Sequence, residues 1–470
     1  MKIYNTLTRQ LEEVKPIDGD TIRIYSCGLT VYDYAHIGNL RKYIFDDLLK
    51  RSLVYFGFKV KHVMNVTDVG HLSSDEDEGE DKIEKGAARE NKSAYEVAKF
   101  YENAFVEDMK KLNILMPNVM PRATENIQEQ IDLITELEER GFTYKTSDGI
   151  YFDTSKLNDY GKLAQLDIEN LQEGIRVEKN PEKRNATDFA LWKFSYPEKS
   201  QLATHNSQLG AKRDMEWESP WGVGFPGWHL ECSAMSTKFL GQPFEIHTGG
   251  VDHIPVHHTN EIAQSEAAYG KPLAKYWIHS EHLLENGRKM AKSDGHFIRL
   301  QDLEEKGYSA LDFRYMCLSA KYRSKLDFSY TSLDAAKSAR KRINDAYGAS
   351  LRAESSEPNE SLRATASERG NLSLEPFDLA VSEDLDTPKA LAFVFDNLAK
   401  LSKENFEKID EVLGILEKIE IPREISELVA QREQVRRDRK FDESDRLRRK
   451  IEDMGFILDD SSSHTIIKKK

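Results

Sequence analysis

The segment from Tyr25 to Asn39 constrains the fold of this chain more than any other, because a strand pattern passes into a helical pattern within it. The apolar, β-branched residues Ile22 and Ile24 lead to Cys27, as in a buried parallel strand that ends in a loop. Beyond Asn39 the apolar residues recur at helical spacing, at Leu40, Tyr43, Ile44, Leu48 and Leu49. A helix that begins after such a loop presents free amide groups and its dipole to an anion. The segment therefore predicts a phosphate site, and Cys27 adds a soft metal ligand beside it.

Length and charge limit the kinds of protein that this chain can be. With 470 residues it is too long for one ordinary core, so two or three domains are expected. Its 67 Lys and Arg residues against 81 Asp and Glu give a net charge of −14, which argues against a general polyanion binder and leaves only a local basic surface for a nucleic acid. Three cysteines exclude a disulfide framework, and no apolar run is long enough to span a bilayer. We expect a cytoplasmic protein without membrane contact.

The order of the elements predicts an insertion within an α/β domain. Strand and helix patterns alternate up to about residue 115, and the alternation resumes at Phe244–His247. Between them, from about 117 to 226, a helix and short aromatic strands are separated by polar turns. After Lys289 the pattern is mainly helical, with a polar linker near 352–375. A doubly wound parallel sheet that carries an insertion and is followed by helices explains this order best.

The densest candidate chemistry lies in residues 228–261, which hold five of the chain's 13 histidines. His257 and Glu261 are four residues apart and share one face if the segment is helical, so both could bind one ion. Cys232 from the preceding helix and Cys27 from the first strand could join them. The result would be a Zn²⁺ site of two thiolates, one imidazole and one carboxylate.

Several neighbouring residues have plainer alternatives. A lone cysteine is more often a small buried apolar residue than a ligand, and this is the interpretation we adopt for Cys317. His258 could lie behind the ligands, and His253 could simply be exposed. Farther on, Lys289 and Lys292 stand in a predicted loop before a helix, where they could follow the charge that develops on phosphate oxygens. Most Lys-x-x-Lys loops are solvated surface, so the two lysines indicate a phosphate site only in combination with the segment from His36 to Asn39.

Taken together, two segments carry a family resemblance. His36-Ile-Gly-Asn39 and Lys289-Met-Ala-Lys292-Ser293 resemble the His-Ile-Gly-His and Lys-Met-Ser-Lys-Ser signatures of class I aminoacyl-tRNA synthetases. Within that class the chain most resembles the cysteinyl-tRNA synthetase family, from Tyr4 to its C-terminal module. The specific matches are Tyr25-Ser-Cys-Gly28, Thr30-Val-Tyr-Asp33, Asn65-Val-Thr-Asp68, Asp188-Phe-Ala-Leu-Trp-Lys193, Ser219-Pro-Trp-Gly222, Pro226-Gly-Trp-His-Leu-Glu-Cys-Ser-Ala-Met235, His257-His258, Asn260-Glu261 and Arg323-Ser-Lys-Leu326.

The resemblance implies a class I Rossmann-type fold and a role for each part of the chain. The implied parts are a Rossmann catalytic domain at 1–116 and 227–290, a connective insertion at 117–226, a stem-contact region at 291–350, a helical bundle at 351–420 and a small anticodon-binding module at 421–470. The family's zinc ligands fall on the four residues reached above, Cys27, Cys232, His257 and Glu261. In the family the metal binds the substrate thiolate, which a serine hydroxyl cannot match, so no editing domain is needed.

The resemblance also implies roles for individual residues. Catalysis falls to His36, Asn39, Lys289 and Lys292, and the binding of ATP with Mg²⁺ falls to His36, Gly38, Asn39, His247, Lys289 and Lys292. The binding of L-cysteine falls to Gly28, Thr30, Thr67, Trp228, His229 and Asp252.

Two positions depart from the family signatures, and the charge of the metal site adds a further expectation. Asn39 stands in place of the second histidine, so an amide must supply the hydrogen bond to ATP without the option of a positive charge. Ala291 replaces the serine between the two lysines, and both lysines remain. Zinc with three anionic ligands and the substrate thiolate carries a net negative charge that is costly in a dry pocket. We predict that His229 and the substrate ammonium offset it, with Asp252 orienting the ammonium.

A tRNA partner needs a basic surface on this acidic chain. The predicted contacts are Arg432, Arg436, Arg437, Arg439 and Lys440. Acidic residues are interleaved with them, so a salt-bridged, solvated helix remains an alternative. The predicted function is the ATP-dependent activation of L-cysteine and its transfer to the 3′ end of tRNA(Cys), by a monomer. The alternatives are a cysteine-activating ligase that acts on a non-tRNA amine, and a non-catalytic relative that binds zinc and RNA.

Overall fold

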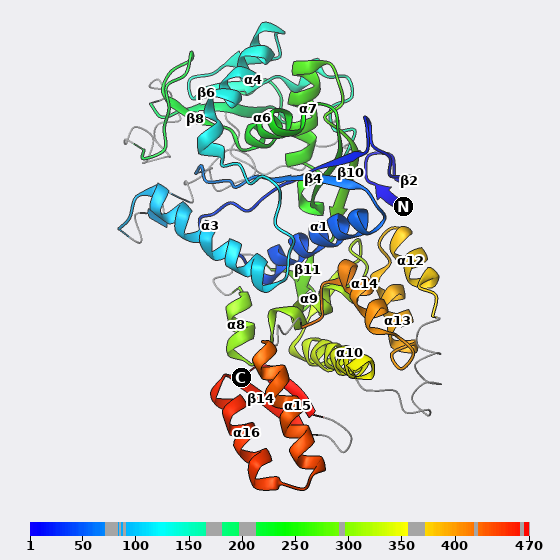
Figure 1. The fold of residues 1–470 in the computed structure, drawn as a ribbon. Coiled ribbons are helices and arrows are strands. Elements are labelled where there is room, and N and C mark those ends of the chain that lie inside the picture. The colour runs from blue at the N-terminus through cyan, green and yellow to red at the C-terminus, as the bar shows by residue number, and fades with distance from the viewer. Residues whose placement is uncertain are drawn as a thin grey trace. The chain divides into compact units, whose positions relative to one another are not determined.

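The structure is a computed structural model that describes residues 1–70, 83, 86–87, 91–165, 181–196, 213–290, 297–355, 372–417, 422–460 and 465–469 (Figure 1). The chain divides into two compact units. The first comprises Met1–Ser338, Ser373–Asp396 and Glu407–Gly414, and the second comprises Ala339–Leu372, Asn397–Phe406 and Ile415–Lys470. Within the described ranges, no helix combines the length and the apolarity that crossing a bilayer requires.

A four-stranded parallel sheet lies at the centre of the first unit and confirms the predicted fold class. Its strands stand in the order β10 (Ala274–Ser280), β9 (Phe244–Gly250), β3 (Thr21–Ser26) and β4 (Lys59–Met64). The chain runs from β3 through helix α1 (Ile37–Tyr55) to β4 on one side, and β9 pairs with the other side of β3. In such sheets ligands bind outside the carboxyl ends of the strands, at the point where the strand order reverses. That point lies between β3 and β9, directly beside Cys27.

The helices around this sheet position the candidate site. Helix α6 (Trp228–Leu240) leads into β9, and helix α7 (His257–Tyr269) leads into β10. The two helices pack against each other, and α6 also packs against β3 (Figure 1). The shared core includes the fully buried residues Leu230, Met235 and Phe244. The hairpin of β1 (Lys2–Asn5) and β2 (Gln10–Glu13) adjoins β10, and helix α3 (Ala94–Lys111) precedes the insertion.

The segment between β4 and β9 carries a second sheet. Its antiparallel strands are β5 (Thr143–Lys145), β6 (Gly149–Phe152), β7 (Phe189–Phe194) and β8 (Gly224–Pro226), in that order. Their aromatic residues fill the interior, because Phe152, Phe189 and Trp192 are all buried. Helix α4 (Ile127–Glu139) packs against α6 and α7 (Figure 1). The insertion predicted from 117 to 226 therefore adjoins the helices that carry the candidate ligands.

The chain after β10 is mainly helical, as predicted. Strand β11 (Leu283–Glu285) forms a hairpin with β12 (Arg288–Lys289) and pairs in parallel with β13 (Leu326–Phe328). The helices are α8 (Leu300–Glu305), α9 (Ala310–Leu318), α10 (Tyr330–Ser355), α12 (Glu375–Ser382), α13 (Thr387–Asp396) and α14 (Lys403–Leu413). Helix α10 extends to Ser355, so the start of the predicted polar linker at 352–375 is helical, while residues 356–371 lie outside the described part.

The C-terminal segment forms a small module in the second unit. It contains helices α15 (Arg423–Arg437) and α16 (Phe441–Asp453) and a hairpin of β14 (Phe456–Asp460) and β15 (Thr465–Lys469). A small apolar cluster of its own holds it together, formed by Ile425, Leu428, Val429, Ile451, Phe456 and Leu458.

Candidate metal centre and nucleotide site

Four predicted ligands meet at the carboxyl end of β3. Cys27 follows that strand, Cys232 lies in α6, and His257 and Glu261 occupy successive turns of α7. One ligand atom from each lies within 4.8 Å of all the others, and all four residues are buried. The two Sγ atoms are 4.0 Å apart, and Cys27 Sγ is 3.8 Å from Glu261 Oε1. His257 Nε2 lies 3.0 Å from the same carboxylate oxygen. Residues separated by more than 230 positions thus converge on one point.

The two thiols have unlike electrostatic surroundings. Burial opposes ionisation of Cys27, but its hydrogen bond with Cys232 and the charge on His257 hold its pKa well below the usual range. Burial raises the pKa of Cys232 well above the usual range, and the neighbouring Cys27 raises it further. Burial alone would lower the pKa of His257, but the charges of Glu261 and Cys27 raise it to about 10. The cluster therefore already places negative charge on Cys27 and positive charge beside it.

A row of neutral imidazoles stands behind Cys27. His258 Nε2 is 3.3 Å from Cys27 Sγ, and His258 Nδ1 is 2.8 Å from His279 Nε2. His279 Nδ1 is in turn 2.8 Å from the hydroxyl of Thr6. Burial lowers the pKa of both histidines well below the usual value, so each ring is neutral and carries a single proton. Because a Cys27 thiolate can only accept, the row donates in one direction, from Thr6 through both rings to the sulfur. His258 therefore lies behind the candidate ligand Cys27, one of the positions that the sequence allowed for it.

Sequence reasoning missed Thr6 and His279. His279 is the penultimate residue of β10, whose carboxyl end lies beside that of β9. A polar residue at the end of a buried parallel strand was the only signal available, since Thr6 lies more than 270 positions away.

His247 lies in the interior beside the four candidate ligands. Its Nε2 is 2.9 Å from Glu261 Oε2, its ring stacks on Trp277, and it has no exposed surface. With Cys27, His258 and Glu261 it forms a second group of four close ligand atoms. The predicted contact of His247 with ATP stays a prediction, although the structure places this ring against a carboxylate that could bind metal.

His229 and Trp228 stand on the other side of His257. The Nδ1 atoms of His229 and His257 are 3.1 Å apart, so the Nε2 atom of His257 remains directed to the cluster. The ring of Trp228 lies over that of His257, with centroids 4.5 Å apart. His229 is therefore positioned to orient the candidate ligand His257, as a hydrogen-bonded neighbour of an imidazole at a metal site does.

The first signature segment forms the beginning of α1. His36 caps this helix, because its Nδ1 accepts the backbone N–H of Asn39 at 3.1 Å while Asn39 Oδ1 accepts the N–H of His36 at 3.3 Å. Such reciprocal bonds satisfy two amide groups that a helix start leaves unpaired. Because Nδ1 of His36 accepts, a neutral ring carries its proton on Nε2. The side-chain amide of Asn39 therefore completes the N-terminal cap of α1.

The second signature segment lies next to the first. Met290 packs beside Gly38, because a Cβ atom added at Gly38 would lie 3.8 Å from Met290 Cβ. The backbone N–H of Ile37 donates to the carbonyl of Ile298 at 2.9 Å. Lys289 ends strand β12, so it lies in a short hairpin rather than in the predicted loop. Lys292 lies outside the described residues.

Asp252 and Lys289 contact each other. The Nζ atom of Lys289 is 3.0 Å from Asp252 Oδ2, and both side chains are about half exposed. Asp252, the predicted partner of the substrate ammonium, therefore forms an ion pair with Lys289, a predicted partner of the ATP phosphates.

The remaining predicted cysteine-binding residues line the ends of β3 and β4. Gly28 donates its N–H to Asn65 Oδ1 at 2.8 Å, and any Cβ at Gly28 would collide with the Asn65 carbonyl. Thr30 pairs with Thr67 in an isolated bridge. The Thr67 hydroxyl donates to Glu231 at 2.6 Å and is buried. Gly28 thus permits the close approach of two strand ends, and Thr67 is fixed by an internal hydrogen bond.

The predicted tRNA contacts do not share one environment. Arg436, Arg437, Arg439 and Lys440 are exposed at the end of α15 and after it. Arg432, in contrast, is only 2% exposed. The exposed residues can meet a polyanion, whereas the burial of Arg432 favours a structural role for that residue.

Comparison with known proteins places the chain in a class and then in a family. A family model described as the class I (C) tRNA synthetase catalytic domain matches residues 13–338. Methionyl-tRNA synthetase of Mycobacterium tuberculosis bound by methionyl-adenylate has a similar fold, with a TM-score of 0.56 and 14% identity over 84% of this chain and 88% of that one. The fold and the matched domain define a class I aminoacyl-tRNA synthetase.

The particular family follows from closer relatives. Cysteine–tRNA ligase 1 of Burkholderia lata is 45% identical, covering 98% of this chain and 95% of the relative. Cysteine–tRNA ligase of Treponema denticola is 42% identical, covering 100% of this chain and 99% of the relative. The chain belongs to the cysteine–tRNA ligase family.

Proposed function

We propose that this enzyme activates L-cysteine with ATP to cysteinyl-adenylate and transfers the cysteinyl group to the 3′ end of tRNA(Cys), as a cytoplasmic monomer. The convergence of Cys27, Cys232, His257 and Glu261 beside the helix that begins at His36 carries the proposal. The test is ATP–pyrophosphate exchange with cysteine or serine as the amino acid, together with metal analysis of the same preparation. Exchange that depends on cysteine and on about one zinc ion per chain is expected.

The donor set suits Zn²⁺. Two sulfur atoms bound tetrahedrally at about 2.3 Å from one ion lie about 3.8 Å apart, which is close to the 4.0 Å between Cys27 and Cys232. Two soft thiolates, an imidazole and a carboxylate are ligands that favour Zn²⁺ over Mg²⁺. When bound, the ion would offer a coordination position that a substrate thiolate fills far better than a serine hydroxyl.

Activation requires positioning and charge rather than a protein nucleophile. Attack of the cysteine carboxylate on the α-phosphorus of ATP forms the adenylate and releases pyrophosphate. We expect the Nε2 proton of His36 and the positive end of the α1 dipole to stabilise phosphate oxygens. Lys289 and Lys292 would balance the charge that grows on the leaving group. Lys289 would first leave Asp252, which then becomes available to the substrate ammonium.

His229 should tune the selection of cysteine. We expect His229→Ala to raise the KM for cysteine by about tenfold, because loss of a ligand's hydrogen-bonded neighbour typically costs 10–100-fold at metal sites. The pH dependence of that KM should shift as well, since the imidazole would no longer offset the charge of the ligand set. Steady-state exchange between pH 6 and 9 measures both quantities. An unaltered KM and pH profile would contradict this role.

The C-terminal module should be needed for tRNA charging and not for the activation of cysteine. A chain truncated after Ile419 is expected to keep cysteine-dependent exchange within about twofold, because the proposed ligands and signature segments lie far upstream. It should lose most tRNA charging and the steep salt dependence of tRNA binding that phosphate contacts produce. Charging assays at two salt concentrations measure this. Equal charging by the truncated and full chains would overturn the assignment and would favour an acceptor that needs no anticodon contact.

A further inference from the structure

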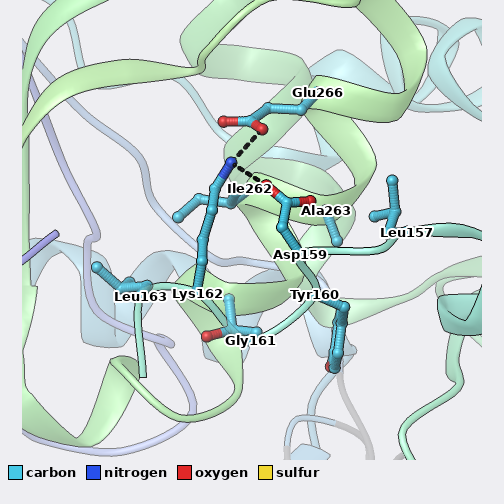
Figure 2. Close-up of a pocket in the computed structure, with 10 residues that line it drawn as sticks. Leu157, Asp159, Tyr160, Gly161, Lys162, Leu163, Ile262, Ala263 and Glu266 are labelled. Atoms are coloured by element: carbon cyan, nitrogen blue, oxygen red, sulfur yellow. Dashed lines mark hydrogen bonds and ion pairs between the residues drawn. The ribbon is translucent and has the colours of Figure 1, made fainter. Parts of the chain in front are cut away.

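A segment of the insertion lies across helix α7, which carries His257 and Glu261. This segment, Leu157–Leu163, lines a small pocket together with Ile262, Ala263 and Glu266 of the helix (Figure 2). Leu163 is fully buried in the same apolar core as Ile262, and Leu157 and Tyr160 pack against that core. The 157–163 segment is therefore docked on the helix by apolar contacts.

Two polar contacts hold the segment against α7, one at Asn260 and the other at Glu266. The phenol of Tyr160 donates to Asn260 Oδ1 at 2.7 Å, and Asn260 is a buried residue that directly precedes Glu261. Lys162 Nζ lies 2.5 Å from Glu266 Oε2 and 3.0 Å from Asp159 Oδ2 (Figure 2). The Lys162 and Glu266 side chains are only 29% and 25% exposed, so this pair is shielded from water more than an ordinary surface pair.

Helix α6 holds α7 at Gln264, which lies roughly opposite Glu266 around the helix. Gln264 Nε2 donates to the carbonyl of His229 at 2.5 Å and to Ser233 Oγ at 2.7 Å. Helix α6 holds Cys232, so this side fixes α7 relative to one ligand of the set. The 157–163 segment supplies the restraint on the other side.

Small rotations of α7 would matter to a metal. A rotation of about 10° moves an atom that lies roughly 6 Å from a helix axis by about 1 Å. Metal–ligand distances tolerate only about 0.2 Å. His257 and Glu261 lie on α7, whereas Cys27 and Cys232 lie on other elements. The four can bind one ion only while the rotation of α7 is fixed.

We propose that Tyr160 and Lys162 are positioning residues, which hold α7 in the rotation at which His257 and Glu261 share an ion with the two cysteines. The connective insertion thereby contributes to the selection of cysteine, although none of its residues is among the four candidate ligands. This inference rests on the proposed zinc-dependent function.

The test compares Tyr160→Phe, Lys162→Met and the double variant with the wild-type chain, all loaded with zinc. The double variant should release zinc to a chromogenic chelator about tenfold faster and raise the KM for cysteine by a similar factor. The KM for ATP and kcat should stay within about twofold. Lys162→Arg, unlike Lys162→Met, should keep the zinc release rate and the cysteine KM of the wild type, because arginine keeps a cation opposite Glu266. Replacement of zinc by Co²⁺ should give altered visible absorption bands in the double variant, since these report ligand geometry.

A matched control is available in the same insertion. Arg140→Met removes the ion pair between Arg140, the C-cap residue of α4, and Glu136 in the last turn of that helix. It should leave zinc release and the KM for cysteine unchanged. Wild-type zinc release and cysteine KM in the double variant would overturn the inference while leaving the proposed function intact. A wild-type chain that holds no zinc and still prefers cysteine to serine would instead overturn the proposed function.

Discussion

Replacement of Cys232 by alanine is expected to abolish stoichiometric zinc binding and to lower cysteine-dependent ATP–pyrophosphate exchange by at least about a thousandfold. Loss of a ligand's neighbour already costs 10–100-fold at metal sites, and loss of a ligand removes more. Cys232 has no exposed surface and its sulfur lies 4.0 Å from that of Cys27, so alanine at this position leaves Cys27 as the one thiol in the candidate ligand set. Emission spectrometry after dialysis against a weak chelator, combined with exchange assays, measures both effects.

Cys317 provides the control for this experiment. It is also buried, and burial raises its pKa to about 12, so it stays a protonated thiol that serves packing in α9. Cys317→Ala should keep the zinc content and exchange of the wild type while losing about 1 kcal/mol of stability. Full zinc content and intact discrimination against serine in Cys232→Ala would refute the metal assignment.

The second large effect is expected for the signature lysines. Lys289→Ala and Lys292→Ala should each lower the kcat of cysteine-dependent exchange by about 100- to 1,000-fold, the typical cost of removing one charge-stabilising donor from a transition state. The Kd of cysteine should change less than about threefold, because charge on the phosphates grows only during the reaction. Pre-steady-state adenylate formation, with cysteine binding measured separately, distinguishes the two quantities.

Stability does not confound this result. The Lys289–Asp252 pair is about half exposed, so its loss should cost at most about 1 kcal/mol. Arg288 is the matched control, since it is an exposed cation on the same strand whose side chain points to the other face of the sheet. Arg288→Ala should exchange at the wild-type rate. A wild-type kcat in Lys289→Ala would mean that this lysine does not meet the phosphates.

The sequence predicted those parts of the site that local patterns define. Cys27 could be placed at a strand end from the apolar run before it, and the spacing of His257 and Glu261 required only that the segment be helical. The parallel sheet followed from the alternation of strands and helices, and the insertion followed from its interruption. The spacing of Cys27 and Cys232, some 200 positions apart, is a weak signal, and the family resemblance added support by falling on the same four residues.

Features that depend on distant contacts could not be predicted. Arg432 belongs to a run of charged residues that a sequence describes as exposed, yet the fold buries it. The chain breaks between α12 and α13 because Asp384 and Leu385 adopt positive φ angles of 58° and 54°. Asp384 is held there by the hydroxyl of Tyr322 at 2.6 Å and by the backbone of Tyr4 at 2.9 Å, contacts that no local pattern reveals.

The hydrogen-bonded row from Thr6 to Cys27 makes the candidate metal ligand Cys27 depend on Thr6, the residue that follows β1 in the β1–β2 hairpin. Since each neutral imidazole has one proton to give, inverting the tautomer of one ring forces its neighbour to invert too. The bond dipoles of the row add together, with their positive ends toward the sulfur. A valine in place of Thr6, which removes the hydroxyl at the start of the row, would therefore reach the thiolate by rearranging protons.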